Sequence, residues 1–184
     1  MKEISGGALI TKILIQNGIN KAFCVPGESY LGVLEAIRKS KTKFDLVVCR
    51  HEGGSAYMAE AYGRLTQMPG ICFVTRGPGA CNASIGVHTA YQEGTPLILF
   101  VGQVPVKSLN KNAFQSIDTD KLFNSIAKYT ETIKDPKNIR KTLEKAIYIS
   151  TEGKPGPVVL GIPEDIQFAM VSDKISEVLE NKTH

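Results

Sequence analysis

Four short segments of this sequence combine glycine or proline with polar side chains, and each follows an apolar run that is typical of a β-strand. They are residues 26–28 (Pro-Gly-Glu), 50–54 (Arg-His-Glu-Gly-Gly), 75–82 (Thr-Arg-Gly-Pro-Gly-Ala-Cys-Asn) and 102–105 (Gly-Gln-Val-Pro). In an open parallel sheet, ligands bind beyond the carboxyl ends of the strands, so these segments should meet at one rim. Glycine at such a rim lets the backbone approach a ligand closely or adopt a positive φ. Within these segments, Glu52 is the carboxylate that we single out for acid–base chemistry.

Three generic interpretations compete with that one. Residues 77–79 (Gly-Pro-Gly) lack the GxGxxG spacing of a dinucleotide-binding turn, because Asn82 stands where the third glycine belongs, and no GxxxxGK[ST] phosphate loop occurs. A metal site made of His51, Glu52 and His88 is disfavoured, since the sequence has no HExxH spacing. Glu52 could also be a plain helix-start carboxylate that the helix dipole stabilises. On chemistry alone, the helix-start and acid–base interpretations both stay open.

Hydrophobic periodicity predicts that helices and strands alternate along the chain. Near-continuous apolar strands, each followed by a helix, indicate an α/β fold with an open parallel sheet and helices on both faces. One domain over residues 1–166 is expected, followed by a polar tail over 167–184 with a weak helical pattern at Ile175, Val178 and Leu179. Helices are predicted over residues 4–17, 30–40, 53–66, 80–92, 118–128 and 138–150, and strands over 21–25, 46–49, 71–74, 97–101, 130–133 and 158–162.

The composition excludes several classes of function. The 184 residues carry a net charge of +4, but the basic residues are dispersed. The densest basic run, over residues 38–43, has no interleaved aromatic side chains, which favours a solvated helix end over a nucleic-acid site. No segment approaches the roughly 20 apolar residues that cross a bilayer. No signal peptide is evident, and the four cysteines form no CxxC pair, so we expect a cytoplasmic protein with reduced thiols.

Six segments, in order, resemble the pyrimidine-binding domain of thiamine diphosphate enzymes of the acetolactate synthase and pyruvate oxidase family. The similarity covers residues 3–166, and one position departs from the pattern, since the family commonly has Thr or Ala where Cys81 stands. The segments are VPG (25–27), RHEGGSAYMAEAYGR (50–64), TRGPGACN (75–82), GQVP (102–105), AFQSID (113–118) and GPVVLGIP (156–163).

The resemblance implies a role for Glu52. In this family a glutamate hydrogen-bonds N1′ of the cofactor's aminopyrimidine and so promotes removal of the proton at the thiazolium C2 carbon. A carboxylate suits this role because it can exchange a proton with N1′, whereas the cofactor itself does the difficult chemistry. Glu52 matches that position. By the same resemblance, the residues that line the pyrimidine are Pro26, Gly27, Gly77, Pro78 and Asn82.

Other positions carry a functional and a structural alternative. Phe114 and Gln115 match family positions on the substrate side of the thiazolium, with Gln115 as a second catalytic candidate, and the alternative is a core aromatic beside a loop amide. Asn82 could instead be a polar residue in the first turn of a helix. His88 is interpreted as a structural or interface histidine. Residues Arg50 and Arg76 either meet anionic substrate groups or form salt bridges within the protein.

The resemblance also implies a missing half. The family binds the diphosphate and its Mg²⁺ with a second domain that carries a GDG…N motif, and no Gly-Asp-Gly occurs here. We therefore expect no metal site in this chain, a diphosphate-binding domain of the same or another chain as partner, a homodimer or tetramer, and FAD as an optional cofactor of the complete enzyme.

The expected function is a carboligase of the acetolactate synthase type that is inactive alone. Its alternatives are a 2-oxo acid decarboxylase of the same family and a stand-alone, non-catalytic interaction module. The chain would be either a truncated fragment, with residues 167–184 starting an interdomain linker, or one subunit of a split enzyme.

Overall fold

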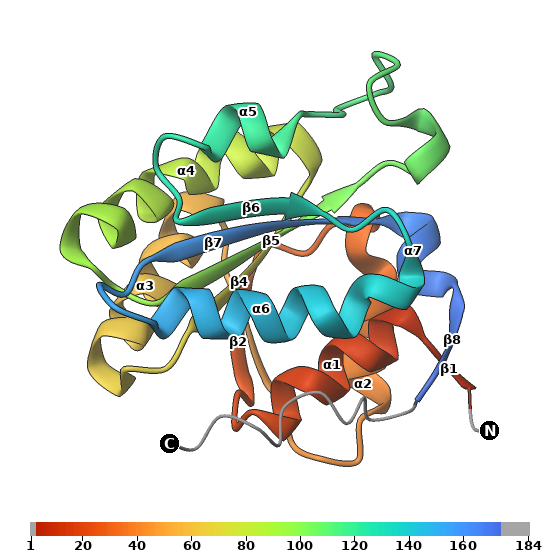
Figure 1. The fold of residues 1–184 in the computed structure, drawn as a ribbon, viewed down its shortest axis with the longest axis horizontal. Coiled ribbons are helices and arrows are strands. Elements are labelled where there is room, and N and C mark those ends of the chain that lie inside the picture. Colours follow the sequence, from red (N-terminus) through yellow and green to blue (C-terminus); the bar gives the residue numbers. More distant parts are fainter. Residues whose placement is uncertain (1–2, 174–184) are drawn as a thin grey trace.

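A six-stranded parallel sheet forms the centre of the computed structural model, which describes residues 3–173 (Figure 1). The strands follow the spatial order β3-β2-β4-β5-β7-β6, and every neighbouring pair is parallel. The predicted open parallel sheet is therefore confirmed. The strands are β2 (Lys21–Cys24), β3 (Asp45–Val48), β4 (Gly70–Thr75), β5 (Leu97–Gln103), β6 (Tyr129–Thr132) and β7 (Pro157–Pro163).

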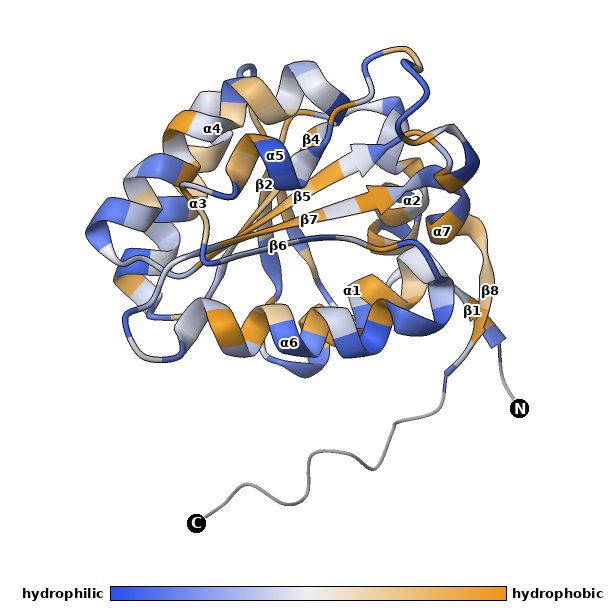
Figure 2. Cartoon of the chain, turned by 45° about the horizontal axis from the view of Figure 1, so that its top comes forward, coloured by the Kyte–Doolittle hydropathy of each residue, from blue (hydrophilic) through white to orange (hydrophobic). Residues whose placement is uncertain are grey.

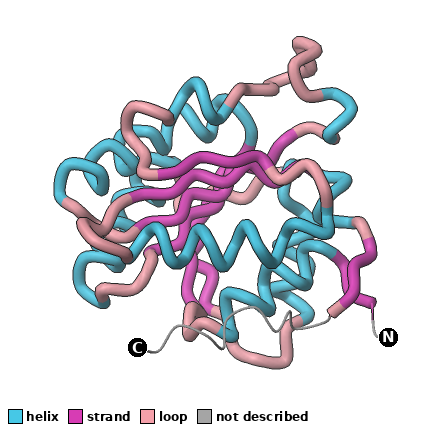
Figure 3. Tube along the Cα trace, in the orientation of Figure 1, coloured by secondary structure: helices cyan, strands magenta, loops and turns pink. Residues whose placement is uncertain are grey.

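Helices cover both faces of this sheet, as Figure 3 shows by colour. On one face lie α1 (Gly6–Gln16), α2 (Leu31–Lys39), α6 (Ile139–Thr151) and the short α7 (Glu164–Phe168). On the other face lie α3 (Glu52–Thr66), α4 (Arg76–Glu93) and the short α5 (Thr119–Phe123). Three single-turn 3₁₀ helices complete the connections, namely η1 (Glu28–Tyr30), η2 (Val106–Ser108) and η3 (Pro136–Asn138).

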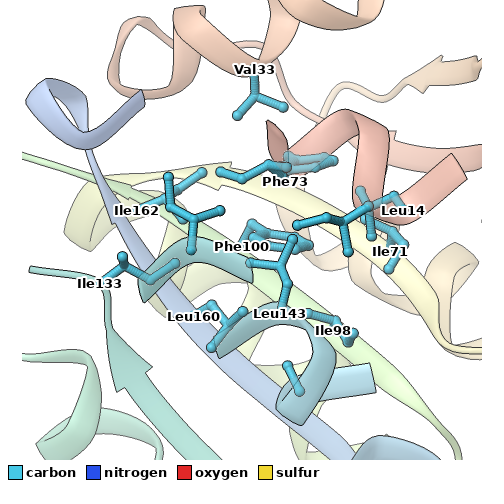
Figure 4. Packing of buried hydrophobic residues seen from close by; sticks show 14 of the residues in the cluster. Leu14, Val33, Ile71, Phe73, Ile98, Phe100, Ile133, Leu143, Leu160 and Ile162 are labelled. Atoms are coloured by element: carbon cyan, nitrogen blue, oxygen red, sulfur yellow. The ribbon is translucent and has the colours of Figure 1, made fainter. Parts of the chain in front are cut away.

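The central strands are buried on both sides, which explains their continuous apolar sequence. In β4, Ile71 and Phe73 point into the core beneath α1 and α6, while Cys72 and Val74 point towards α3 and α4. This follows from the two-residue period of a strand. Figure 2 shows the same concentration of hydrophobic residues along β5 and β7. In the first core, the rings of Phe73 and Phe100 stack with centroids 4.7 Å apart (Figure 4).

The predicted first helix starts two residues late because Ser5 caps it. The Ser5 hydroxyl accepts a hydrogen bond from the backbone N–H of Ala8 at 3.2 Å, so α1 begins at Gly6 rather than at residue 4. The residues before it form β1 (Glu3–Ser5). Gly18 adopts a φ of +75° just after the helix, as its place at the predicted helix end suggested.

Two predicted elements differ from the structure towards the C-terminus. The helix expected over 118–128 is only the short α5, because Asn124 and Ser125, both poor helix formers, follow the buried Phe123. Part of the expected tail is a strand: β8 (Met170–Ser172) pairs antiparallel with β1, and Val171 is buried. The helical pattern at Ile175, Val178 and Leu179 lies outside the described residues. Within residues 3–173, no helix is long and apolar enough to span a membrane.

Helices α3 and α4 approach each other at backbone distance. A Cβ placed on Gly86 of α4 would lie 2.5 Å from the Cβ of Ala56 in α3 and 2.8 Å from its carbonyl carbon. Ala56 comes one helical turn after Glu52, and Gly86 comes one turn after Asn82. Because residues four apart share a helix face, the contact at Ala56 and Gly86 brings Glu52 and Asn82 together.

This contact yields a stability prediction. We expect Gly86→Ala to lower the free energy of unfolding by about 1–3 kcal/mol, because the added methyl group overpacks the helix interface. Gly54→Ala in α3 is the matched control, since a Cβ there meets nothing within 4 Å. It should leave stability unchanged or raise it by up to about 1 kcal/mol, as expected for alanine in a helix. Urea denaturation checks both, and equal effects of the two substitutions would contradict the proposed close contact.

Candidate active site at the carboxyl rim of the sheet

The segments after β2, β4 and β5 touch one another at one rim of the sheet. A Cβ on Gly27 would lie 2.7 Å from the Cβ of Thr75, and one on Gly102 would lie 2.2 Å from the Ser29 hydroxyl oxygen. The hydroxyls of Ser29 and Thr75 are hydrogen-bonded at 2.8 Å. Glycine is therefore required at positions 27 and 102 because another segment occupies the space of a side chain. The convergence that the sequence predicted is confirmed for these strands.

Tyr30 holds the Pro26–Gly27 segment at this rim. Its side chain is fully buried, stacks on Phe73 with centroids 5.9 Å apart, and donates a hydrogen bond to the carbonyl of Val25. Burial raises the pKa of the Tyr30 phenol far above its ordinary value, so the hydroxyl remains a donor. Pro26 itself is exposed, and Gly27 is half-buried. The two residues thus form a supported edge that is open to a ligand.

Glu52 is the first residue of α3 and is half-buried. Its Oε2 atom accepts a hydrogen bond from the Asn82 side-chain amide at 2.9 Å. Oε1 accepts none from the part of the chain that the structure describes, and it lies 3.5 Å from where a Cβ on Gly79 would stand. One carboxylate oxygen is therefore held by an amide, while the other faces space that a glycine leaves open.

The helix-start interpretation of Glu52 is correct as geometry but incomplete. Glu52 occupies the first turn of α3, where the helix dipole favours a negative charge. The N-terminal end of α3 is capped by the preceding residue, His51. Its Nδ1 atom accepts a hydrogen bond from the N–H of Gly53 at 3.0 Å. The hydrogen bond from Asn82 comes from a different helix, and capping does not require it. The arrangement can present a carboxylate to a nitrogen of a flat ring and exchange a proton with it.

The metal-site alternative is not supported by the placement of its residues. His51 caps α3, and His88 is exposed in the middle of α4. Across residues 3–173, no group of three or more His, Cys, Asp or Glu side chains is arranged to hold a metal ion.

Helix α4 begins at Arg76, four residues before the predicted start at residue 80. Gly77, Pro78 and Gly79 thus lie in the first turns of a helix and not in a preceding loop, which corrects the predicted boundary. Proline is tolerated there because its missing N–H would be unpaired in any helix. Each glycine weakens the helix by about 1 kcal/mol relative to alanine. Close packing favours glycine here, because a Cβ on Gly77 would lie 3.0 Å from the Gln115 carbonyl oxygen and one on Gly79 would lie 3.2 Å from the Cβ of Val74.

Phe114 and Gln115 lie on the long connection between β5 and α5. Phe114 is 77% exposed, so the core-aromatic alternative is wrong for this residue. Gln115 is also exposed and has a φ of +60°. The Gln115 carbonyl accepts a hydrogen bond from the N–H of Gly77 at 2.8 Å. The backbone at Gln115 therefore lies against the first turn of α4, while the side chains of Phe114 and Gln115 are exposed.

The two arginine candidates differ in whether they form an ion pair. Arg76 forms an ion pair with Glu164 at the start of α7, which is the salt-bridge alternative. Arg50 is exposed and forms no ion pair with another residue in the range 3–173. Sequence reasoning missed Gly86, which lies in the middle of α4 and belongs to no chemical motif. It also missed Glu164, although its place directly after β7 was a signal that could have found it.

The cysteines divide by burial, and all four are free thiols as predicted. Cys81 is exposed on α4 beside Asn82, and Cys49 is half-buried. Cys24 and Cys72 lie in the core, where burial raises the pKa of Cys24 to about 11 and that of Cys72 to about 12. The thiolate form that reacts with electrophiles is thus suppressed in the core.

Alkylation with iodoacetamide at about pH 8 should label Cys81 first, because thiolate fraction and exposure together control reactivity. Cys24 and Cys72 should react at least about 100-fold more slowly in the folded protein, and Cys49 at an intermediate rate. Peptide mass spectrometry after timed labelling measures this order, and Cys81→Ser should remove the fast phase. Rapid labelling of Cys24 or Cys72 without unfolding would contradict the core placement.

Comparison with known proteins matches the chain to one family model, described as the N-terminal TPP-binding domain of thiamine pyrophosphate enzymes, over residues 4–122. A probable acetolactate synthase large subunit from Methanocaldococcus jannaschii is 39% identical over 166 residues, covering 89% of this chain and 27% of the relative. Acetolactate synthase isozyme 3 large subunit from Escherichia coli is 34% identical over 166 residues, covering 90% and 29%. The mitochondrial catalytic subunit of acetolactate synthase from Aspergillus candidus is 36% identical over 162 residues, covering 88% and 23%. The chain thus spans less than a third of the length of these relatives.

Proposed function

The chain belongs to the thiamine pyrophosphate enzyme family, as its N-terminal TPP-binding domain, and from this premise we propose that it is the pyrimidine-binding half of an acetolactate synthase-like carboligase acting on 2-oxo acids. The observation that carries the proposal is the hydrogen bond between Glu52 and Asn82, with the second oxygen of Glu52 facing Gly79. The relatives named above are acetolactate synthases, which supports the reaction class.

The residues present fit an aminopyrimidine ring. A flat ring needs an accessible edge at this rim, and there Pro26 and Pro78 are exposed and Gly27 is half-buried. Asn82 would keep the Glu52 carboxylate oriented, so that its free oxygen can bind N1′ and hold or return a proton there. Pro26, Gly27 and Pro78 would line the ring. When bound, the cofactor supplies the electron sink for cleaving and joining 2-oxo acids.

The exposed turn that carries Phe114 and Gln115 is our candidate for the substrate side. Gln115 is held against Gly77 through its backbone, which leaves its side-chain amide free to contact a bound molecule. Phe114 offers a large apolar surface beside it. We assign Gln115 as the second catalytic candidate, and Phe114 as a substrate contact.

A second protein surface should complete this site. The outward faces of α3 and α4 expose large apolar side chains on the two helices that carry Glu52 and Asn82. Exposed apolar patches of this kind mark interaction surfaces. A diphosphate-binding domain with its Mg²⁺, from the same or another chain, and assembly as a homodimer or tetramer would cover them. The side chains are Tyr57, Met58 and Leu65 of α3 and Ile85 and Tyr91 of α4, which are 39–84% exposed.

The proposed location is the cytoplasm. This remains a prediction, because the fungal relative named above is a mitochondrial protein.

The isolated chain should bind thiamine diphosphate weakly and without dependence on Mg²⁺, because the charged end of the cofactor has no anchor among these residues. Isothermal titration calorimetry with and without MgCl₂ measures this. Tight, magnesium-dependent binding by the isolated chain would refute the proposed division of the site between two domains.

Once the chain is complemented with a diphosphate-binding domain, Glu52→Gln should slow hydrogen–deuterium exchange at the cofactor's C2 carbon by about 100-fold or more, the size of a general acid–base contribution. Glutamine keeps the shape and the hydrogen bond to Asn82 but cannot transfer a proton. Glu28→Gln is the matched control, because Glu28 is an exposed carboxylate at the same rim. Proton NMR follows the exchange, and an unchanged rate in Glu52→Gln would sink the assignment.

A further inference from the structure

Three backbone carbonyls of one short turn are held by the ends of neighbouring elements. The turn comprises residues 113–117 and closes on itself through the hydrogen bond from the N–H of Ser116 to the carbonyl of Ala113, at 2.9 Å. Arg76 Nη1 donates to the Phe114 carbonyl at 3.4 Å, the N–H of Gly77 donates to the Gln115 carbonyl at 2.8 Å, and Gln103 Nε2 donates to the Ile117 carbonyl at 2.8 Å.

The 113–117 turn has little apolar packing of its own. Phe114 is 77% exposed, Gln115 is exposed, and the remaining residues are only half-buried. Segments with few buried apolar contacts open readily unless polar contacts restrain them. Ile117 packs against the core beneath α3 and α4, so the position of residues 113–116 is the part that depends on hydrogen bonds to α4.

Arg76 is unusual among these donors because it is a largely buried charge at the wrong end of a helix. Its side chain is 18% exposed at the first position of α4, where the helix dipole disfavours a positive charge. The ion pair with Glu164, which is 29% exposed at the first position of α7, offsets this cost. The planar guanidinium donates to the Phe114 carbonyl through Nη1 and to the Glu164 carboxylate through Nη2. The side chain thus ties α4, α7 and the 113–117 turn together.

We propose that Arg76, held in place by Glu164, is a positioning residue that fixes the 113–117 turn, and with it Phe114 and Gln115, against the first turn of α4. Through Gly79, that first turn also borders Glu52. The consequence for substrate contact rests on the proposed function, whereas the restraint on the turn does not.

Hydrogen–deuterium exchange of the isolated chain tests the restraint without any cofactor. In Arg76→Met, the peptide that covers residues 113–117 should exchange at least about tenfold faster. The reason is that the turn loses the hydrogen bond from the Arg76 guanidinium to the Phe114 carbonyl. Arg140→Met is the matched control. Arg140 is 12% exposed, forms an ion pair with Glu144 on α6, and, like Arg76, has one buried guanidinium nitrogen without a hydrogen-bond partner in residues 3–173. It should leave exchange in the turn unchanged.

Two further variants keep the test decisive if Arg76→Met does not fold. Arg76→Lys keeps the charge but not the fork, so exchange in the turn should rise while the overall stability stays near that of the wild type. Glu164→Gln removes the partner charge and should also raise exchange in the turn. Wild-type exchange at residues 113–117 in both folded variants, or equal acceleration across the whole chain, would overturn the proposal.

In the complemented enzyme, the same variants separate positioning from activation. Arg76→Lys should lower kcat/KM for a 2-oxo acid such as pyruvate by about tenfold or more, because Phe114 and Gln115 are no longer held in position. Exchange at the cofactor's C2 carbon, which depends on Glu52, should stay within about twofold of wild type. Loss of both readouts together, or of neither, would overturn the positioning role. Absence of C2 exchange in the wild type would overturn the proposed function instead, and would leave the result on the isolated chain intact.

Discussion

The contact between Ala56 and Gly86 is the constraint on which the geometry of the candidate site depends. Because Gly86 has no side chain, α3 and α4 approach so closely that a Cβ at this position would overlap with Ala56. One helical turn earlier on each helix, the same approach places Glu52 and Asn82 within hydrogen-bond distance. A bulky residue at position 86 would separate the helices and leave the Glu52 carboxylate without its orienting amide.

The parallel sheet supplies the platform for that contact. The carboxyl ends of parallel strands lie at one edge, and here Gly27 packs against Thr75 and Gly102 packs against Ser29 without room for a side chain. The glycines in the first turn of α4 lower the stability of that helix locally. The rest of this 18-residue helix offsets the cost. The fold thus accepts a local cost in stability and gains close packing of the first turn of α4 against β4 and the 113–117 turn.

Under the proposed function, the molecule forms one side of a shared site. Glu52, Asn82 and the 113–117 turn border space from one direction only, and the adjoining faces of α3 and α4 expose apolar side chains. The chain spans less than a third of each relative compared above. If Glu52 is the catalytic carboxylate and the faces of α3 and α4 bind a partner, as proposed, this arrangement would couple assembly to cofactor binding.

The sequence alone determined the α/β class, the parallel sheet and the rim on which the site lies, because strand and helix periods are local properties and parallel strands must end together. It also singled out Glu52 and Asn82, although through family resemblance rather than periodicity. Only the tertiary structure decided that these two side chains meet, that α4 starts at Arg76, and that Arg76 pairs with Glu164, 88 positions away. Such pairings depend on how helices cross and where chain segments far apart in sequence pack together. No pattern of neighbouring residues encodes that by itself.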